Sequence, residues 1–103
     1  RFLVLCLDAK RRLLRKEEAS RGTLTASLVH PREIFALAIR ERAASILVAH
    51  NHPSGDLAPS DEDLAVTRRL AEAGRLVGIP LDDHLILGRT GFLSFRREGL
   101  LPP

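Results

Sequence analysis

Residues 45–63 read SILVAHNHPSGDLAPSDED, and this stretch decides the fold of the chain. Its first five residues, Ser45–Ala49, are mostly apolar and predict a short buried strand. The segment 50–59 is rich in Pro, Ser, Gly and Asp, which predicts a loop. Ser60 then begins a helix, because Ser60 and Asp63 supply the hydroxyl and the acid of an N-terminal cap. We therefore expect a strand–loop–helix unit.

This unit also holds a candidate metal site. His50 and His52 stand two residues apart, and side chains at this spacing in an extended chain point to the same side. The loop then returns Asp63 to the end of the strand. Two nitrogens and one oxygen suit Zn²⁺ and leave one coordination position open, where water can be activated. The alternative is that the histidines are exposed and that Ser60 and Asp63 serve only as a helix cap.

The segments before and after this unit complete a predicted α/β fold with one mixed sheet and two flanking helices. Continuous or alternating apolar runs predict the strands, and apolar residues at helical spacing predict the helices. The expected strands are Phe2–Leu7, Arg12–Ser20, Thr23–Val29 (a third strand or an extension of the second), Ser45–Ala49, Leu81–Leu87 and Phe92–Phe95, and the expected helices run from Pro31 to about Ala43 and from Ser60 to Val77.

Composition indicates a single domain, because the chain has 103 residues. Four Phe and no Trp or Tyr predict an aliphatic core. The one cysteine, Cys6, lies in an apolar run and is expected to be a small buried hydrophobe, which fits a reducing compartment and a cytoplasmic location. No run approaches the roughly 20 apolar residues of a membrane span, so no membrane partner is expected.

The charge of the chain leaves nucleic-acid binding open. The net charge is +3 and the isoelectric point is near 10.0, with basic clusters at 10–12 and 15–16. A basic groove for DNA is consistent with these clusters. Solvated turns and ordinary helix faces explain them better, because Glu17 and Glu18 follow at once and no aromatic platform interleaves with the charges.

The site residues carry a resemblance to a known family. His50, His52, seven intervening residues, Ser60, two more residues and Asp63 form a pattern that is similar to the JAMM motif of the MPN/JAB metalloprotease superfamily. The string HNHPSGD with the following Pro59 and Ser60 resembles the bacterial RadC branch. Further similarity lies in FLVLCLD at 2–8, GT at 22–23, HPRE at 30–33, DHLILG at 83–88 and SF at 94–95, so the resemblance spans nearly the whole chain.

The resemblance implies a cytidine-deaminase-like α/β fold and a zinc site. His50, His52 and Asp63 would be the metal ligands, and water would be the fourth. In the family's mechanism a glutamate takes a proton from that water, and the hydroxide attacks a peptide or isopeptide carbonyl. Ser60 would be catalytic, as the donor of a hydrogen bond to the developing oxyanion.

The family's glutamate lies just before the first strand, whereas this chain begins with Arg1 directly before Phe2. We therefore expect the chain, 1–103, to be a domain excised from a longer protein, with the catalytic glutamate outside it. None of Glu17, Glu18, Glu33 and Glu41 is predicted to replace that glutamate. Zinc binding with weak or absent hydrolysis is the resulting expectation for this fragment.

Several alternatives stay open at this stage. His84 could orient a ligand imidazole, but a structural polar cluster at a strand entry is favoured, and for Thr67 the default is helix surface. The rival functions are a DNA-repair or DNA-processing accessory domain and an interaction domain with a vestigial metal site. Exposed sheet edges make a homodimer possible.

Overall fold

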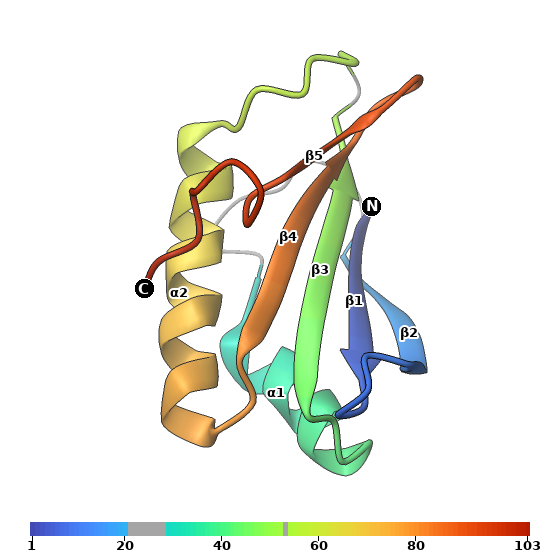
Figure 1. Ribbon diagram of the computed structural model, residues 1–103, viewed down its shortest axis with the longest axis vertical. Helices are drawn as coiled ribbons and strands as arrows, with labels where there is room; N and C mark the ends of the chain where they lie inside the picture. Colours follow the sequence, from blue (N-terminus) through green and yellow to red (C-terminus); the bar gives the residue numbers. More distant parts are fainter. Residues whose placement is uncertain (21–28, 53) are drawn as a thin grey trace.

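The computed structural model describes residues 1–20, 29–52 and 54–103 (Figure 1). It confirms the predicted α/β class, with a mixed five-stranded sheet and two helices. The predicted strand at 23–29 lies almost entirely outside the described residues, and Val29 itself is in neither a strand nor a helix. The elements are β1 Phe2–Leu7, β2 Leu13–Ser20, α1 Pro31–Arg40, β3 Ser45–Asn51, α2 Asp61–Val77, β4 Leu81–Leu87 and β5 Phe92–Ser94.

The sheet has the strand order β2-β1-β3-β4-β5. Strand β1 is antiparallel to both β2 and β3, and β5 is antiparallel to β4. Strands β3 and β4 are parallel, which requires a long crossover between them, and α2 supplies it. Because parallel strands end at the same edge, the carboxyl end of β3 lies beside that of β4, with Asn51 opposite Leu87. The start of α2 returns to this edge (Figure 1).

One hydrophobic core joins the sheet to both helices. Alternate residues of β1 (Phe2, Val4 and Cys6) are buried, as the period of two in a strand predicts. The two helices pack on this face with apolar stripes at helical spacing. The buried core residues of the central strand and the helices are Ile46 and Val48 from β3, Ile34, Phe35, Leu37 and Ala38 from α1, and Val66 and Leu70 from α2.

The core is not purely aliphatic, which corrects the prediction from composition. Phe2, Phe35 and Phe95 are 2%, 4% and 0% exposed. Phe2 and Phe95 lie against histidine rings: the Phe2 ring centroid is 6.2 Å from that of His50, and the Phe95 centroid is 4.5 Å from that of His84. Although the sequence has few aromatic residues, three of its phenylalanines are therefore in the core. The rings of Phe2 and Phe95 pack there against buried imidazoles.

Two element boundaries differ from those predicted. Helix α1 ends at Arg40 rather than near Ala43, since Arg42 has a left-handed backbone (φ 56°) and the Ala43 N–H donates to the Ala38 carbonyl at 2.9 Å. Strand β3 continues to Asn51, so His50 lies in the strand and not in the loop. The strand is extended because His50 pairs with Phe2 of β1 and with Ile86 of β4. These strands are distant in the sequence, so the local pattern did not predict the extension.

Cys6 is fully buried in β1, as its apolar surroundings predict. Burial raises the pKa of its thiol above the usual 9.0, with the nearby carboxylates of Glu41 and Glu17 acting in the same direction, so the group stays protonated at neutral pH. None of the helices in the described ranges has the length and apolar character needed to cross a membrane.

Candidate metal centre

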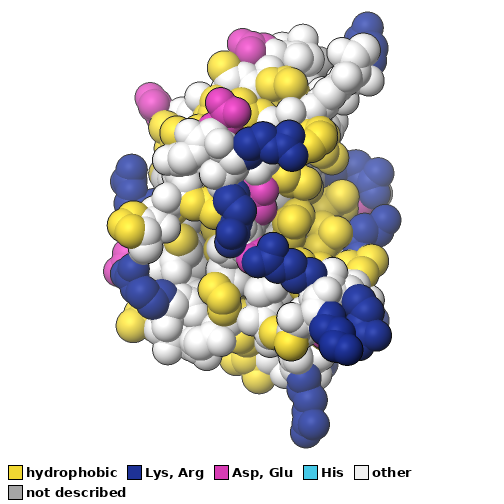
Figure 2. All heavy atoms as spheres, viewed as in Figure 1, with side chains coloured by type: hydrophobic (Ala, Val, Ile, Leu, Met, Phe, Trp, Pro, Cys, Tyr) yellow, Lys and Arg dark blue, Asp and Glu magenta, His cyan; other side chains and the backbone are white. Residues whose placement is uncertain are grey.

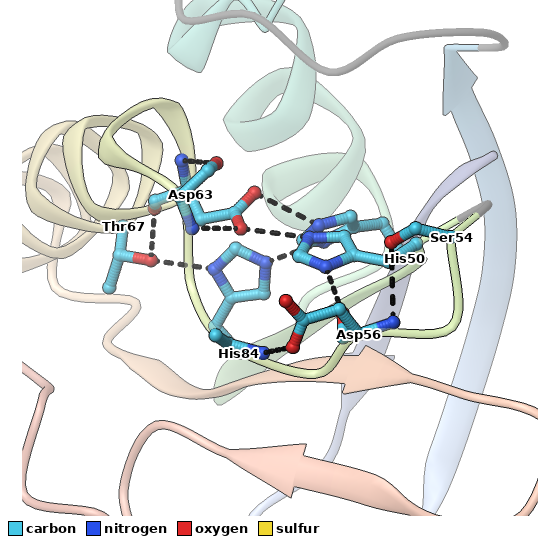
Figure 3. A network of polar contacts seen from close by, with 9 residues as sticks. His50, Ser54, Asp56, Asp63, Thr67 and His84 are labelled. Atoms are coloured by element: carbon cyan, nitrogen blue, oxygen red, sulfur yellow. Dashed lines mark hydrogen bonds and ion pairs between the residues drawn. The ribbon is translucent and has the colours of Figure 1, made fainter.

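The structure brings His50, His52 and Asp63 together, as the sequence predicts. One ligand atom from each lies within 4.8 Å of the others. His50 Nε2 is 3.0 Å from Asp63 Oδ1, and His52 Nε2 is 2.9 Å from Asp63 Oδ2. The carboxylate thus faces both rings, one with each oxygen, at the point where β3 ends and α2 begins (Figure 3).

Ser60 holds the Asp63 carboxylate in place from the N-terminus of α2. The two residues form a capping box: the Asp63 N–H donates to Ser60 Oγ at 3.1 Å, and the Ser60 N–H donates to Asp63 Oδ2 at 2.8 Å. Burial raises the pKa of Asp63, but the contact with the His50 side chain and the hydrogen bond from the Ser60 N–H outweigh this effect and hold the pKa well below its usual range. The carboxylate is therefore ionised at neutral pH, although it is 1% exposed.

The loop between β3 and α2 fixes the ring of His52. His52 Nδ1 lies 2.6 Å from the carbonyl oxygen of Asp56, and a carbonyl only accepts, so Nδ1 carries the proton. The loop is itself braced, because Asp56 N–H donates to Ser54 Oγ at 3.2 Å and Ala58 N–H donates to Asp56 Oδ1 at 3.0 Å. A neutral His52 therefore turns the lone pair of Nε2 toward Asp63.

The ring of His50 is held from behind by two buried residues. His50 Nδ1 lies 2.9 Å from His84 Nε2, and His84 Nδ1 lies 2.6 Å from Thr67 Oγ1. The Thr67 hydroxyl donates to the Asp63 carbonyl oxygen at 2.8 Å (Figure 3). His84 is 0% exposed, and burial is the main cause that lowers its pKa to about 3. His84 is thus a neutral ring in contact with a predicted ligand.

These contacts correct the interpretations favoured for His84 and Thr67. Thr67 is 1% exposed and is not helix surface, and His84 belongs to the site rather than to an independent structural cluster. Spacing could have indicated Thr67, because residues four apart, here Asp63 and Thr67, share a helix face. Nothing local indicated His84, since it reaches His50 only through the parallel pairing of β4 with β3.

The adjacent Asp83 has the structural role that was expected for the cluster. Its side chain accepts from Ser94 Oγ at 2.5 Å and from the Arg96 N–H at 2.9 Å, which ties β4 to the segment around β5. Side chains of successive strand residues point to opposite faces of the sheet. The Asp83 side chain therefore stabilises the face of the sheet opposite to the face that carries His84 and the candidate site.

The donor set fits a cation. His50 Nε2 is buried and has no hydrogen bond of acceptable geometry, despite lying 3.0 Å from Asp63 Oδ1. With neutral rings, the nitrogens that face the carboxylate are acceptors, so three acceptors converge without a donor among them. Such an arrangement is unfavourable when buried unless a positive charge joins it. Two imidazole nitrogens and one carboxylate oxygen are compatible with a metal site.

The four glutamates considered from the sequence as a general base lie away from the three candidate ligands. Glu17, Glu18 and Glu33 line a cavity of about 260 Å³ between β2 and α1, together with Val4 and other apolar residues. Glu41 is the C-cap residue of α1. Within the described ranges, the group of potential metal ligands at the end of β3 contains no glutamate. The backbone nitrogen of Arg1 lies 3.1 Å from Asn51 Oδ1, at the end of β3.

A second cavity of about 260 Å³ opens beside His52. The ends of β3 and β4 and the loop after β3 form its walls. It therefore lies beside one of the three candidate ligands. Its lining residues are Asn51, His52, Gly55, Leu87, Gly88 and Arg89.

Comparisons with known proteins agree with this geometry. A family model described as "RadC-like JAB domain" matches residues 1–100. A UPF0758 protein of Symbiobacterium thermophilum is 56% identical over 100 residues, which cover 97% of this chain and 43% of that protein. UPF0758 proteins of Pelobacter propionicus and Methanosarcina barkeri are 52% and 48% identical over 97% and 98% of the chain. The chain spans less than half the length of these relatives: it covers 44% of each of the latter two proteins.

Proposed function

This chain belongs to the RadC-like JAB domain family, and from that premise we propose that it is a zinc-dependent metallohydrolase domain that acts on peptide or isopeptide bonds. The observation that carries the proposal is the convergence of His50 Nε2, His52 Nε2 and the Asp63 carboxylate on one point. A bound zinc ion would supply Lewis acidity and would lower the pKa of a water at the open position. We propose the same activity for the longer relatives, of which this chain matches less than half.

Ser60 is proposed as the residue that stabilises the oxyanion. Its Oγ accepts the Asp63 N–H in the capping box, so its own hydroxyl hydrogen is not needed for the cap. That hydrogen can therefore be donated to an oxygen that gains charge when a carbonyl next to the site is attacked. The cap fixes the hydroxyl on a rigid helix end, which preorganises this donor.

We infer that the general base comes from residues that precede β1. Phe2 pairs with His50 across β1 and β3, so a residue just before β1 would lie near the end of β3 that carries His50. The family's glutamate precedes the first strand, which agrees with this position. Residues 1–103 without that segment are then expected to bind zinc and to hydrolyse peptides weakly or not at all.

A DNA-processing role, the main alternative, has less support. Lys and Arg side chains are spread over the face shown in Figure 2 rather than gathered in one groove. Three arginines of the chain are paired with acids: Arg11 and Arg96 both lie within 3.3 Å of Asp82, and Arg12 lies 2.8 Å from Asp8. DNA binding that weakens steeply with added salt would favour this alternative.

Location and assembly are proposed on more general grounds. The buried, unpaired thiol of Cys6 suits a reducing compartment, so we propose a cytoplasmic location. Among the strands that the structure describes, β2 and β5 lie at the two edges of the sheet, and either edge offers backbone groups to a second copy. A homodimer therefore stays a prediction, which light scattering of the purified protein tests.

The decisive experiment pairs metal content with hydrolysis. Elemental analysis of the purified protein is expected to give one zinc per chain, and the protein that retains the segment before β1 is expected to cleave peptide or isopeptide substrates. Asp63→Asn should abolish both properties. A protein that binds no zinc, or that binds zinc and cleaves none of a broad panel even with that segment present, would contradict the proposal.

A further inference from the structure

The buried contacts behind His50 set the direction of a series of hydrogen bonds. Thr67 has a single hydroxyl hydrogen, and it is donated to the Asp63 carbonyl oxygen at 2.8 Å. The 2.6 Å contact between Thr67 Oγ1 and His84 Nδ1 then needs a hydrogen from His84, since the hydroxyl has none left. His84 is therefore protonated at Nδ1.

The same reasoning continues to His50. The His84 ring is fully buried and its two nitrogens contact Thr67 and His50, with no carboxylate at either one to balance a charge, so a ring protonated at Nδ1 has its lone pair at Nε2. The 2.9 Å contact between His84 Nε2 and His50 Nδ1 then needs a hydrogen from His50 Nδ1. A neutral ring protonated at Nδ1 has its lone pair at Nε2, which is the atom that faces Asp63 Oδ1 at 3.0 Å. One hydroxyl thus decides which nitrogen of His50 is the acceptor.

We propose that Thr67 and His84 are positioning residues that fix the tautomer of His50, so that its Nε2 lone pair is directed into the metal site. The inference rests on the proposed metal site. His52 has a simpler arrangement for the same purpose, because its Nδ1 donates directly to the Asp56 carbonyl oxygen at 2.6 Å. The two ligand histidines are thereby oriented by independent means, one by the loop and one by α2 and β4.

Packing supports a fixed arrangement of these rings. His84 lies between two phenylalanines, stacked on Phe95 at 4.5 Å between centroids and edge-on to Phe2 at 6.1 Å. His50 also stacks on Phe2, at 6.2 Å. Burial and these ring contacts disfavour turning the rings over, so we expect a change of tautomer when a hydrogen-bond partner is lost.

Thr67→Val tests the proposal because it replaces the hydroxyl by a methyl group of similar size. Without the hydroxyl, His84 Nδ1 has no acceptor, and His84 gains by protonating Nε2 instead. His50 must then protonate its own Nε2, which opposes metal binding. Ring-nitrogen NMR of the metal-free protein is expected to show His50 protonated at Nδ1 in the wild type and partly at Nε2 in Thr67→Val. Zinc affinity should fall by about 10-fold or more.

Two further variants control the experiment. Thr67→Ser keeps the hydroxyl and should restore both the His50 tautomer and the zinc affinity. Thr90→Val makes the same chemical change at an exposed position and should leave both unchanged. Wild-type His50 protonated at Nε2, or a folded Thr67→Val with unaltered tautomer and affinity, would overturn the proposal.

The two proposals fail in different ways. A wild-type protein that binds no zinc contradicts the metal site, while the NMR of the metal-free protein still decides whether Thr67 sets the His50 tautomer. A protein that binds zinc equally well with and without the Thr67 hydroxyl keeps the metal site and loses the positioning role. If Thr67→Val does not fold, the ring tautomers of His50 and His84 in the wild type decide the matter, since the proposal requires both to be protonated at Nδ1.

Discussion

Ser60 and Asp63 hold each other through two reciprocal hydrogen bonds, and the Asp63 carboxylate that completes this cap is the same group that faces His50 and His52. The start of helix α2 is therefore also one wall of the candidate metal centre. This double use means that folding and metal binding can be separated only by substitutions chosen to affect one of the two roles.

Substituting Asp63 by Asn should separate them. The amide oxygen can still accept the Ser60 N–H, so the cap is largely kept, whereas the negative charge that attracts a cation is lost. Removing a residue that only hydrogen-bonds to a metal ligand lowers metal affinity by roughly 10- to 100-fold. Removing the charge of the ligand itself should lower zinc affinity by more than that. Competition with a chelating dye measures the affinity, and circular dichroism should show an intact fold. Retention of wild-type zinc affinity would contradict the role of Asp63.

Substituting Ser60 by Ala or by Gly should separate its two roles. Ala at an N-cap costs about 1 kcal/mol of stability, whereas Gly costs only a few tenths, by the usual preferences for this position. Both remove the hydroxyl, so both should lower kcat by about 100-fold or more if Ser60 stabilises the oxyanion. Urea denaturation gives the stability, and steady-state kinetics of the protein that retains the segment before β1 give the rate. Equal activity of the wild type and the Gly variant would limit Ser60 to the cap.

Histidine substitutions should show which rings bind metal. His52→Ala removes a predicted ligand and should reduce bound zinc from one ion per chain to nearly none. His30→Ala is the matched control, because His30 is exposed at the start of α1 and its side chain makes no capping hydrogen bond. Metal content after exhaustive dialysis is the measurement. Similar zinc content in the two variants would show that the metal lies elsewhere.

Asp8 should make stability depend on acid pH. Hydrogen bonds from the backbone of Arg12, then from its side chain and from the Lys10 backbone, lower the pKa of Asp8 below 3.8 despite an opposing effect of desolvation. A depressed pKa stabilises the fold above pH 3.8, and this contribution is lost as the pH falls below that value. The difference in urea midpoint between the wild type and Asp8→Asn should therefore shrink below pH 3.8. A difference that does not change with pH would refute this assignment.

Gly74 should resist replacement even though it lies inside α2. A methyl group there would lie 2.5 Å from the Ile79 carbonyl oxygen and 3.3 Å from Phe35 Cζ. Ala gains about 1 kcal/mol in helix propensity, but the overlap with backbone costs about 1–3 kcal/mol, so Gly74→Ala should be destabilising. Gly91→Ala is the control, because a methyl group meets nothing within 4 Å there. Urea denaturation of both variants is the measurement, and a more stable Gly74→Ala would contradict the packing.

Local signals in the sequence were enough for most of the fold. The apolar runs of β1, β3 and β4 and the cap at Ser60 placed these elements within a few residues, because they reflect backbone preferences and burial at neighbouring positions. Boundaries such as the end of α1 and the extension of β3 depended on contacts between distant segments. The residues at 21–28 lie outside the described structure, so the strand predicted there stays a prediction.

The sequence by itself determined the strand–loop–helix unit and the three converging residues His50, His52 and Asp63, because spacing along one strand and one helix start fixes their relative directions. Only the tertiary structure decided that His84 and Thr67 complete the site. Their contacts cross from β4 to β3 and from α2 to β4. The choice of neighbouring strands comes from how the whole chain buries its apolar surface, and no short stretch of residues records it.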